Sequence, residues 1–446
     1  MNAPEIRLDG NITISGTEPE STRRVMEANT YANPKYSEAI RQGRSVRWID
    51  HEIRTYQETD CGLVLPRGYL SELRTFEPNC RIEDHRTDAV ASFPAPQGVT
   101  LRPYQLTAVE EALKAEQGII QAPTGSGKTV MGMSLLARLN RRALVLTHST
   151  ELAKQWQEVI RQRLGIEAGI IGGGKWTEGE IITVAMLQTL HRNPERTRQI
   201  AKSYGVTLND EVHHVCATTF AEVLSWLPAR YRYGLSATPH RRDGLDVLIH
   251  RVVGPTLARV EKADVEQAGG TVPAVVKVIE SGFVPGYVES WGEFVDSLIG
   301  DDGRNRLIIA MAEKAATAMP TLVLVERIEH AETLAALASV PCVMVHGGLP
   351  AKERTTAMAA ISGARLTIGT VGMLGEGLDV SGWGALVLAS PISSKVRLNQ
   401  AIGRILRPHM GKTRGYVADI LDKHPLALAS FKKRHAIYRD QRIQVT

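Results

Sequence analysis

The sequence predicts an α/β fold in which two consecutive parallel-sheet units follow a small N-terminal α+β module. Short apolar runs typical of buried strands alternate with helical patterns from about residue 118 to residue 240, and again from about residue 321 to residue 408. Such alternation implies parallel strands covered by helices on both faces. Because 446 residues exceed what one core supports, two or three domains are expected.

Composition divides the chain into four parts. We expect an N-terminal accessory module over 1–97, a first α/β unit over 98–255, a charged and glycine-broken linker over 256–303, and a second α/β unit over 304–446. The first thirty residues are polar and are expected to form an irregular lead-in. The module is a candidate DNA contact and carries no catalytic motif. Its expected elements are helices over 36–42 and 68–76 and strands over 46–56 and 62–65.

Charge and cysteine usage bound the class of protein. The net charge of +5 is small, but residues 395–446 contain twelve Lys/Arg against three Asp/Glu. This basic excess fits either an anionic polymer or a solvated helical face. The four cysteines form no CxxC pair, which argues against a zinc ribbon or an iron–sulfur cluster. With no secretory signal and no run of about 18 apolar residues, a cytoplasmic protein without membrane contact is expected.

A glycine-rich stretch, QAPTGSGKT at 121–129, lies between a predicted strand and a predicted helix. This context is typical of a phosphate-binding loop, although Ala122 stands where the strict pattern has glycine. Backbone N–H groups and the helix N-terminus would bind phosphate oxygens. Lys128 would reach the β- and γ-phosphates of ATP, and Thr129 would bind Mg²⁺. The expected nucleotide-binding residues of the loop are Pro123, Thr124, Gly125, Ser126, Gly127, Lys128 and Thr129.

An acidic pair, Asp210-Glu211, follows a predicted strand about eighty residues after this loop. Asp210 would hold Mg²⁺, and Glu211 would orient and deprotonate the water that attacks the γ-phosphate. A further predicted strand ends in Ser236 and Thr238, whose hydroxyls could sense the geometry of the bound phosphate and metal. A pair of plain surface carboxylates is the alternative, and the upstream loop argues against it.

The tetrapeptide Arg-Pro-Tyr-Gln at 102–105 opens a predicted helix shortly before the loop. The Gln105 amide could read an adenine edge through its donor and its acceptor. Arg102 or Tyr104 could stack on the base. By itself this motif is weak evidence for nucleotide binding.

The second unit contains no second phosphate loop. Its strands are expected over 321–325, 342–345, 366–368 and 385–388. Arg404 and Arg407, in the motif QAIGRILRP, are expected to project from one helical face, where guanidinium groups suit phosphate oxygens. Taken alone, such a pair is more often a surface salt-bridge face.

Together these motifs resemble those of superfamily 2 helicases. The series is RPYQ, APTGSGKT, HSTELAKQW, GGG, ITVAMLQ, DEVHH, SATP, VERIEH, VHGGL, GTVGMLGEGLD and QAIGRILR. It covers about residues 100–408. Within the superfamily, DEVHH, SATPHRRDG and QAIGRILRP look most like the XPB branch, which includes phage UvsW-type enzymes. His148-Ser149-Thr150 departs from the Pro-Thr-Arg of many relatives, so one expected phosphate-contacting arginine is missing.

The resemblance implies two RecA-like lobes that close on ATP and Mg²⁺. Gln105 would then recognise adenine, and Gln400, Arg404 and Arg407 would complete the catalytic site beside Lys128 and Glu211. Gly377 and Asp379 would lie at the ribose and phosphates, and His213, Ser236 and Thr238 would couple hydrolysis to movement. The nucleic-acid contacts implied are Ser149, Thr150, Gly173, Thr183, Arg327, His346, Gly347 and Thr370.

The main hypothesis is therefore an ATP-dependent DNA helicase or translocase that acts on duplex or branched DNA. An RNA helicase, or the motor subunit of a restriction or defence complex, is the alternative among enzymes. A nucleic-acid clamp without turnover is a different class, and the intact Glu211, Arg404 and Arg407 argue against it. A signalling or transport ATPase is a third class. The second unit, which has two arginines but no phosphate loop of its own, argues against that class.

Overall fold

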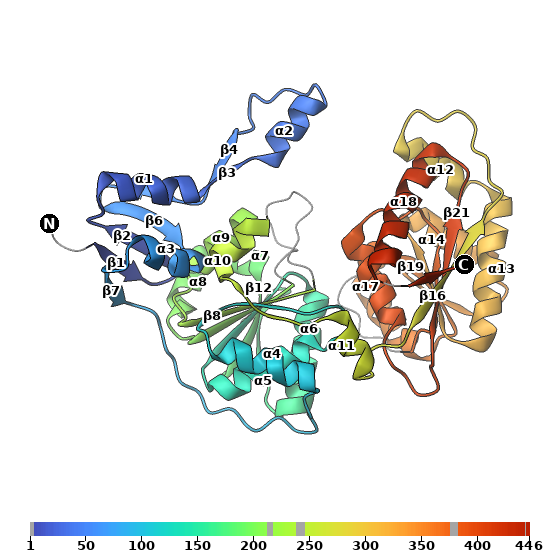
Figure 1. Cartoon of the computed structure of the whole chain (residues 1–446). Coiled ribbons are helices and arrows are strands. Elements are labelled where there is room, and N and C mark those ends of the chain that lie inside the picture. Colours follow the sequence, from blue (N-terminus) through green and yellow to red (C-terminus); the bar gives the residue numbers. More distant parts are fainter. Residues whose placement is uncertain (1–3, 212–216, 238–245, 375–381, 442) are drawn as a thin grey trace. The chain divides into compact units, whose positions relative to one another are not determined.

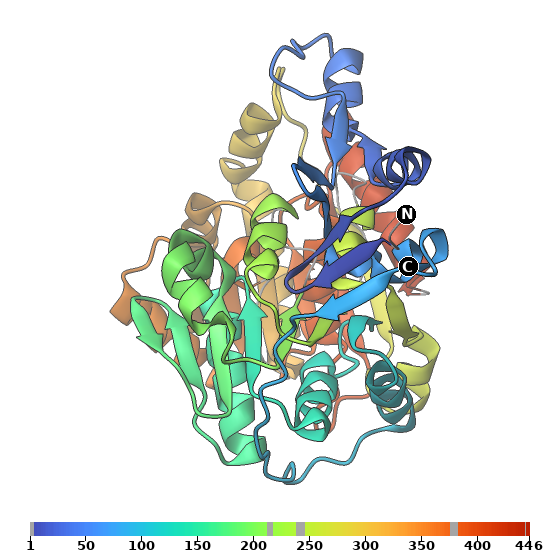
Figure 2. The same cartoon turned by 90° about the vertical axis from the view of Figure 1, so that its left-hand side faces the viewer.

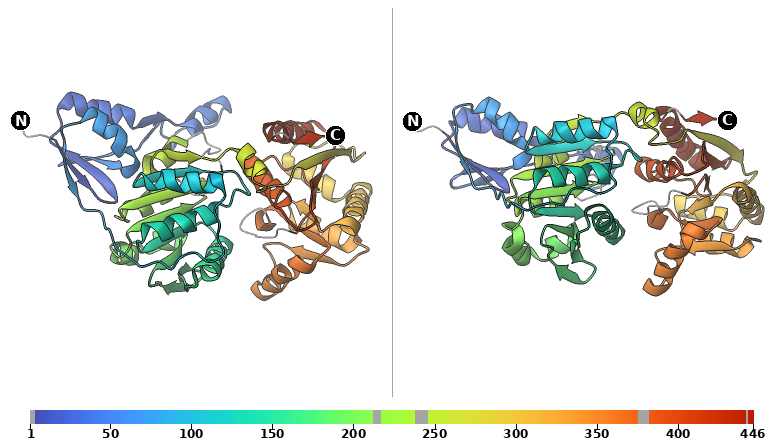
Figure 3. Two further views of the ribbon diagram at one scale, coloured as in Figure 1. Left: turned by 60° about the horizontal axis from the view of Figure 1, so that its bottom comes forward. Right: turned by 90° about the horizontal axis from the view of Figure 1, so that it is seen from below.

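The computed structural model describes residues 4–211, 217–237, 246–374, 382–441 and 443–446. The described chain forms two compact units, one from Met1–Pro123 and Gly127–Lys262 and the other formed chiefly by Ala263–Thr446. Within each unit, helices cover both faces of a large sheet (Figures 1 and 3). None of the helices in the described ranges is both long and apolar enough to cross a bilayer.

The N-terminal module contains its own five-stranded sheet, in the order β5-β6-β2-β1-β7. Its strands are β1 (Glu5–Leu8), β2 (Asn11–Ser15), β5 (Gln57–Thr59), β6 (Gly62–Pro66) and β7 (Arg81–Asp84). Its helices are α1 (Pro19–Ala28) and α3 (Leu70–Phe76), and a hairpin of β3 (Thr30–Ala32) and β4 (Glu52–Arg54) encloses α2 (Pro34–Arg41). Alternate residues such as Ile6, Leu8, Ile12 and Ile14 are buried against one another.

This sheet corrects two expectations. The expected irregular lead-in is wrong, because β1 and β2 pair as an antiparallel hairpin and α1 follows. Of the strand expected over 46–56, only β4 forms, and β5 begins just after that range, at Gln57. Strands β1 and β2 have only four and five residues, so their alternation of apolar and polar residues does not stand out in a polar sequence. Pairing of β2 with β6 and of β1 with β7, which are distant in the chain, stabilises them.

The first unit is built on an eight-stranded sheet, in the order β11-β10-β12-β9-β13-β14-β8-β15. Every pairing is parallel except that of β11 with β10. The strands are β8 (Gln117–Gln121), β9 (Ala143–Thr147), β10 (Gly169–Gly172), β11 (Lys175–Thr177), β12 (Ile182–Met186), β13 (Val206–Asp210), β14 (Tyr231–Ser236) and β15 (Thr256–Arg259). The helices are α4 (Pro103–Leu113), α5 (Lys128–Leu139), α6 (Thr150–Leu164), α7 (Leu187–Arg192), α8 (Pro194–Ala201), α9 (Ala217–Ser225) and α10 (Asp246–Val253).

The second unit has a wholly parallel seven-stranded sheet, in the order β18-β19-β17-β20-β21-β16-β22. The strands are β16 (Ala274–Glu280), β17 (Thr321–Val325), β18 (Cys342–Val345), β19 (Leu366–Thr370), β20 (Ala385–Leu388), β21 (Gly415–Leu421) and β22 (Gln444–Val445). The helices are α12 (Trp291–Ile299), α13 (Asp302–Ala318), α14 (Ile328–Leu337), α15 (Ala351–Ala360), α16 (Val371–Leu374), α17 (Lys395–Ile405) and α18 (Pro425–Asp440).

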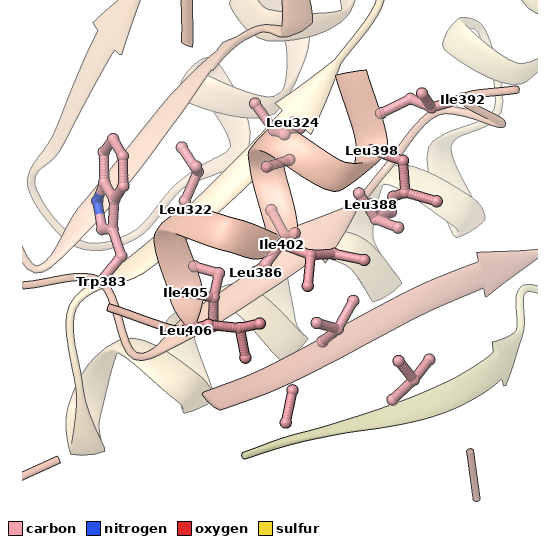
Figure 4. Close-up of a cluster of buried hydrophobic side chains, with 14 of the residues drawn as sticks. Leu322, Leu324, Trp383, Leu386, Leu388, Ile392, Leu398, Ile402, Ile405 and Leu406 are labelled. Carbon is pink, nitrogen blue, oxygen red and sulfur yellow. The ribbon is translucent and has the colours of Figure 1, made fainter. Parts of the chain in front are cut away.

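Helix α17 is held on this sheet by one apolar stripe. Leu398, Ile402 and Ile405 recur at helical spacing and pack, together with Leu406, on Leu386 of the sheet (Figure 4). All of these side chains are buried. The packing fixes the helix whose polar residues the sequence assigns to the site.

The stretch 256–303 is not a separate linker. Strand β15 pairs with β8 in the first sheet, whereas β16 pairs with β21 in the second. Between them lies α11 (Lys262–Gln267). Glycines and charged residues flank both strands, and this composition predicts a linker. The strands form because each pairs with a strand more than a hundred residues away in the chain.

Part of the C-terminal basic excess is structural. The Arg434 guanidinium on α18 lies 2.8 Å from Oδ1 of Asp419 on β21, and both side chains are almost fully buried. The Tyr438 hydroxyl donates a 2.7 Å hydrogen bond to Oδ2 of the same carboxylate. Arg434 therefore docks the last helix and is not part of a surface for an anionic polymer.

Buried arginines fix the N-terminal module to the first unit. Arg67 donates from Nε to Oε1 of Gln117 at 2.9 Å, and the Gln117 amide donates back to the Arg67 carbonyl at 2.9 Å. Arg232 on β14 donates to the Gly10 carbonyl at 3.0 Å, and burial lowers the pKa of its guanidinium to about 9. A Cβ added at Gly10 would lie 2.0 Å from the Ser225 carbonyl oxygen. Backbone therefore meets backbone, and the module is a rigid part of this unit.

Candidate functional site

The loop after β8 has the backbone that phosphate binding needs. Gly125 and Gly127 have φ angles of 86° and 81°, a conformation that favours glycine, and Gly127 is the N-cap of α5. At the start of the loop, the Ala122 N–H donates to the Ser236 carbonyl at 2.9 Å. Alanine fits here because Ala122 does not adopt the left-handed backbone that favours glycine, and its small side chain is buried. The departure from the strict pattern therefore leaves the loop geometry intact.

Close packing sets the position of α5. A Cβ at Gly132 would lie 2.9 Å from side-chain atoms of both Leu208 and Leu235, so the helix approaches β13 and β14 as closely as a glycine allows. Its N-terminus, with Lys128 and Thr129 in the first turn, thereby lies at the carboxyl edge of the sheet. This is the edge where parallel α/β sheets bind ligands.

The acidic pair meets the loop at this edge. Nζ of Lys128 lies 3.3 Å from Oε1 of Glu211, and the two side chains are only 11% and 16% exposed. Asp210 ends β13, and strand pairing places it opposite Leu235, next to Ser236. The structure therefore brings Lys128, Asp210, Glu211 and Ser236 together in one unit.

Asp210 is buried, and its carboxylate is paired with an indole. Burial first, and then the neighbouring Glu211 carboxylate, raise the pKa of Asp210 to about 6. Nε1 of Trp156 on α6 donates a 2.8 Å hydrogen bond to Oδ2 of Asp210, which favours the ionised form. The sequence motifs predict no role for Trp156. Its helical spacing with Leu152 and Ile160 indicates only a buried face.

Glu211 adopts a left-handed backbone with φ of 52°, one of two such non-glycine residues in the described ranges. Glutamate pays a steric cost of roughly 1–2 kcal/mol in this conformation. Backbone strain of this kind concentrates at functional sites, because the surrounding structure must hold it in place. The turn directs the Glu211 carboxylate towards Lys128.

Gln105 is also brought to the loop. Its Oε1 accepts a hydrogen bond from the Arg102 N–H at 2.9 Å as part of a capping box at the start of α4. Its Nε2 lies so near Gly127 that a Cβ there would be 2.5 Å away. Tyr104 is only 8% exposed, which leaves little of its ring for stacking on a base. Arg102 remains the candidate for that contact.

Three of the expected nucleic-acid contacts of the first unit cluster. Ser149 caps α6 by accepting from the Leu152 N–H at 3.2 Å, and Thr150 begins the helix. Gly173 follows β10 with φ of 58°, and a Cβ there would lie 3.9 Å from Cγ2 of Thr150. All three lie at the carboxyl ends of their strands.

The expectation for Thr183 is wrong. Thr183 lies near the start of β12, away from the carboxyl edge, and is fully buried. Its hydroxyl accepts from the Gly179 N–H at 3.0 Å and hydrogen-bonds the Tyr204 hydroxyl at 2.9 Å. The exposed residue beyond the other end of this strand is Gln188, whose amide donates to the His148 carbonyl at 3.0 Å.

In the second unit, the expected contacts again follow strand ends. Arg327 comes just after β17 and pairs with Oδ1 of Asp296 at 2.6 Å. His346 follows β18 and is buried, whereas the adjacent Gly347 is exposed. Thr370 ends β19 and is 8% exposed. These residues therefore share the carboxyl edge of the second sheet.

Gln400 and Arg404 lie on α17, but Arg407 does not. The helix ends at Ile405, and the Arg407 N–H donates to the Arg404 carbonyl at 3.2 Å in the turn that follows. The expectation that both arginines project from one helical face is therefore wrong. Nζ of Lys412 donates to the Arg407 carbonyl at 3.0 Å and holds that turn. Four assigned residues, His213, Thr238, Gly377 and Asp379, lie outside the described residues.

The donor set fits Mg²⁺ bound together with a nucleotide. In the described ranges, no three His, Cys, Asp or Glu side chains gather as an all-protein metal site. Mg²⁺ needs no such cluster, because it is usually held by one or two protein oxygens, substrate phosphates and waters. Asp210 and the Thr129 hydroxyl could supply those protein oxygens.

A cavity of about 430 Å³ lies elsewhere in the first unit. It is lined by residues from the module, such as Tyr56 and Gln57, and by residues of α9 and α10, such as Glu222 and Leu248. None of the residues assigned to the phosphate site lines it. This cavity lies at the junction between the module and helices α9 and α10 and is not the nucleotide site.

Comparisons with known proteins agree with the two sheets and the loop. The model of the family described as "Type III restriction enzyme, res subunit" matches residues 98–241, and that of "Helicase conserved C-terminal domain" matches residues 304–409. In the solved structures, yeast Dbp5 bound to RNA and ADP BeF3 has a TM-score of 0.57 at 17% identity, over 78% of this chain and 94% of that one. A DNA-bound type ISP restriction enzyme, LlaBIII, has a TM-score of 0.56 at 15% identity, over 76% and 30%. At these identities the structures show the fold alone.

Curated relatives are also helicases. "Probable helicase D10" of Escherichia phage T5 is 27% identical over 80% of this chain and 79% of its own length. "DNA 3'-5' translocase XPB2" of Sulfurisphaera tokodaii is 31% identical over 52% of this chain and 50% of its own length. "DNA 3'-5' helicase XPB" of Kineococcus radiotolerans is 27% identical over 76% and 63%. The chain thus spans about four fifths of the phage relative but only half to two thirds of the XPB relatives.

The fold and the site define a helicase-type ATPase with two RecA-like lobes, as the sequence predicted. The chain belongs to the superfamily 2 helicases and is of the XPB-like type.

Proposed function

We propose that this protein is an ATP-dependent DNA helicase or translocase. The observation that carries the proposal is the meeting of Lys128 and Glu211 at 3.3 Å beside the buried Asp210. A cation for phosphates, a carboxylate for the attacking water and a carboxylate for the metal thus lie at one sheet edge. ATP is the substrate that uses all three.

The geometry supports a hydrolysis in which Glu211 changes partners. Lys128 now pairs with the Glu211 carboxylate, and the β- and γ-phosphates of ATP would compete for the same ammonium group. Once released from Lys128, Glu211 can orient the attacking water and accept its proton. Asp210 and Thr129 would hold Mg²⁺, which supplies positive charge to the phosphates when it is bound. Trp156 keeps Asp210 oriented and favours its ionised form.

The second lobe supplies the remaining groups in this proposal. Gln400, Arg404 and Arg407 would contact the phosphates, with Gly377 and Asp379 at the ribose and phosphates.

In the first lobe, Ser236, Thr238 and His213 would couple hydrolysis to movement. The lobes themselves would comprise residues 98–262 and 263–446, after a module of residues 1–97, since β15 and β16 belong to different sheets. We expect the protein to work in the cytoplasm.

DNA is the proposed polymer because five of the curated relatives are named as DNA helicases or translocases, whereas one, aligned over 72% of this chain, is named as an RNA helicase. The contacts would come from Ser149, Thr150 and Gly173 in the first lobe. In the second lobe they would come from Arg327, His346, Gly347 and Thr370. Backbone and hydroxyl groups of this kind position phosphates without reading sequence.

The test is ATPase stimulation by a panel of single-stranded DNA, duplex DNA, a fork, a four-way junction and RNA. We expect DNA to stimulate turnover and the stimulation to fall steeply with salt, because phosphate contacts dominate binding. A mock preparation from cells that lack the protein is the blank for contaminating ATPases. A response to RNA alone would replace the DNA assignment by an RNA helicase, and no response to any polymer would refute the proposal.

A further inference from the structure

An arm formed by residues 30–54 extends from the N-terminal module. It consists of the β3–β4 hairpin and α2, and it projects away from the module's sheet (Figures 1 and 2). None of the helicase motifs lies in it, and the function proposed above leaves it without a role.

The tip of the arm is an ordered structure. Helix α2 ends in a Schellman motif, in which Gly43 has φ of 64° and the Arg44 N–H donates to the Ala39 carbonyl at 2.9 Å. The buried Asn33 side chain caps the helix and also donates to the Asp50 carbonyl at 2.8 Å. The tip is therefore built to hold its surface residues in place.

That surface carries cations and one exposed aromatic ring. Trp48 is 88% exposed. Such exposure is rare for tryptophan, whose large and mostly apolar side chain is usually buried. The Arg47 guanidinium lies 5.4 Å from the centre of its ring. Arg41, Arg44 and Arg47 are all exposed, and among the described residues no carboxylate forms an ion pair with them. Three cations without a carboxylate partner, next to a largely exposed aromatic ring, suit a nucleic acid, which offers phosphates to the cations and bases to the ring.

The foot of the arm is fixed to the first lobe. The Tyr31 hydroxyl on β3 accepts a 2.6 Å hydrogen bond from Nε of Arg251 on α10. The same guanidinium pairs with Glu72 on α3 at 2.6 Å and lies 4.6 Å from the ring centre of Tyr69. Whatever the arm holds is thus mechanically joined to the lobe that carries the phosphate loop.

We propose that the tip of this arm binds unpaired nucleic acid, with a base stacked on Trp48 and neighbouring phosphates on Arg41, Arg44 and Arg47. An unpaired strand is the ligand because a long duplex hides the faces of all but its two terminal base pairs, whereas a single strand or fork presents a run of open faces. The proposal rests on the proposed function, in that it assigns the helicase a strand-holding site outside the two lobes.

The experiment measures the binding of fluorescent single-stranded, forked and blunt duplex DNA without nucleotide. Trp48→Ala should weaken binding of single-stranded and forked DNA about tenfold, the size of one lost base stack, and leave the blunt duplex within about twofold. Replacing Arg41, Arg44 and Arg47 together by Gln should lower the slope of log K against log salt by about 2 to 3 for the same ligands.

Matched controls separate this site from general charge and surface effects. The triple change of Arg7, Arg23 and Arg24 to Gln removes the same charge from exposed positions of the same module, and Tyr287→Ala removes an exposed ring from the second unit. We expect neither control to affect binding selectively. Equal affinities of Trp48→Ala and the unchanged protein for single-stranded DNA, or an equal loss on blunt duplex, would overturn the proposal.

The readout also distinguishes this proposal from the proposed function. If no DNA stimulates the ATPase but Trp48→Ala still weakens binding of unpaired DNA, the helicase assignment fails and the arm site stands. If DNA stimulates the ATPase and the arm variants bind normally, only the arm site fails.

Discussion

The indole of Trp156 donates a 2.8 Å hydrogen bond to the carboxylate of Asp210, and both side chains are buried. Fifty-four positions separate the two residues in the chain. The bond joins α6, whose N-terminus carries Ser149 and Thr150, to the strand that carries the acidic pair. It thus connects a candidate nucleic-acid contact with the candidate metal ligand.

Trp156→Phe should impair ATP hydrolysis through Asp210. Loss of the donor removes a bond to the ionised carboxylate and should raise the pKa of Asp210 above about 6, by roughly one unit. The acid limb of the pH profile of kcat/KM should then move to higher pH, with activity about tenfold lower at pH 5, about twofold lower at pH 7 and almost unchanged at pH 8.5. The control is Trp226→Phe, which changes a partly buried indole in the same unit. An unmoved acid limb would show that the bond has no catalytic effect.

Lys128→Ala and Glu211→Gln should each reduce nucleic-acid-stimulated turnover by at least about 100-fold. Glu211→Gln should still bind ATP, because the ammonium and the loop remain, whereas Lys128→Ala should bind it poorly. Turnover and the affinity for a fluorescent ATP analogue check both statements. The exposed changes Lys154→Ala and Glu158→Gln on α6 serve as controls. Substantial turnover by purified Glu211→Gln protein would remove Glu211 from the catalytic residues.

Glu211→Gly should be more stable than Glu211→Ala by about 1 kcal/mol. Both changes remove the carboxylate and its pair with Lys128, but only glycine accepts a φ of 52° without strain. Equilibrium denaturation of the two variants measures the difference. An alanine variant that equals or exceeds the glycine variant in stability would mean that the left-handed backbone stores no strain.

Asp210→Asn should stabilise the protein without nucleotide at pH 8 by up to about 3 kcal/mol. The native state retains a proton on Asp210 up to about pH 6, whereas the unfolded chain releases it near pH 3.8. The cost of ionising the buried carboxylate therefore builds up between about pH 4 and pH 6 and is fully present above pH 6. Melting temperatures of the variant and the unchanged protein should differ at pH 8 and converge towards pH 4. The exposed Asp60→Asn should show no such dependence.

The second lobe should lose stability below pH 6.5 because of His330. Burial first, and then the Arg304 cation, lower the pKa of its imidazole to about 3. The unfolded chain takes up a proton near pH 6.5 that the native state refuses, so stability falls by about 1.4 kcal/mol per pH unit below that value. The free energy of unfolding should therefore be about 1.4 kcal/mol lower at pH 5.5 than at pH 7.5, and His330→Gln should lack this difference. The exposed His409→Gln should retain it, and an unchanged slope in His330→Gln would contradict the assignment.

The sequence alone predicted the two parallel-sheet units, the phosphate loop and the acidic pair. These features depend on local patterns, because a buried strand, a glycine loop and a helix N-terminus follow one another within about twenty residues. The residue types that bind phosphate and metal are few, so Lys128 and Asp210-Glu211 could be assigned from position and chemistry. Lys128 can meet Glu211 because β8 and β13, with β14 between them, are parallel strands that end at one edge of the sheet.

Tertiary structure decided what depends on distant partners. The small sheet of the module, the division of 256–303 between two sheets and the burial of Thr183 follow from pairings that no local pattern shows. Arg407 leaves the helical face because α17 ends two residues earlier. Helical spacing predicts only that Trp156 is buried, and the fold shows that β13 places the Asp210 carboxylate beside its indole. Local periodicity predicts which face of an element is buried, but only the packed fold determines which polar group meets it there.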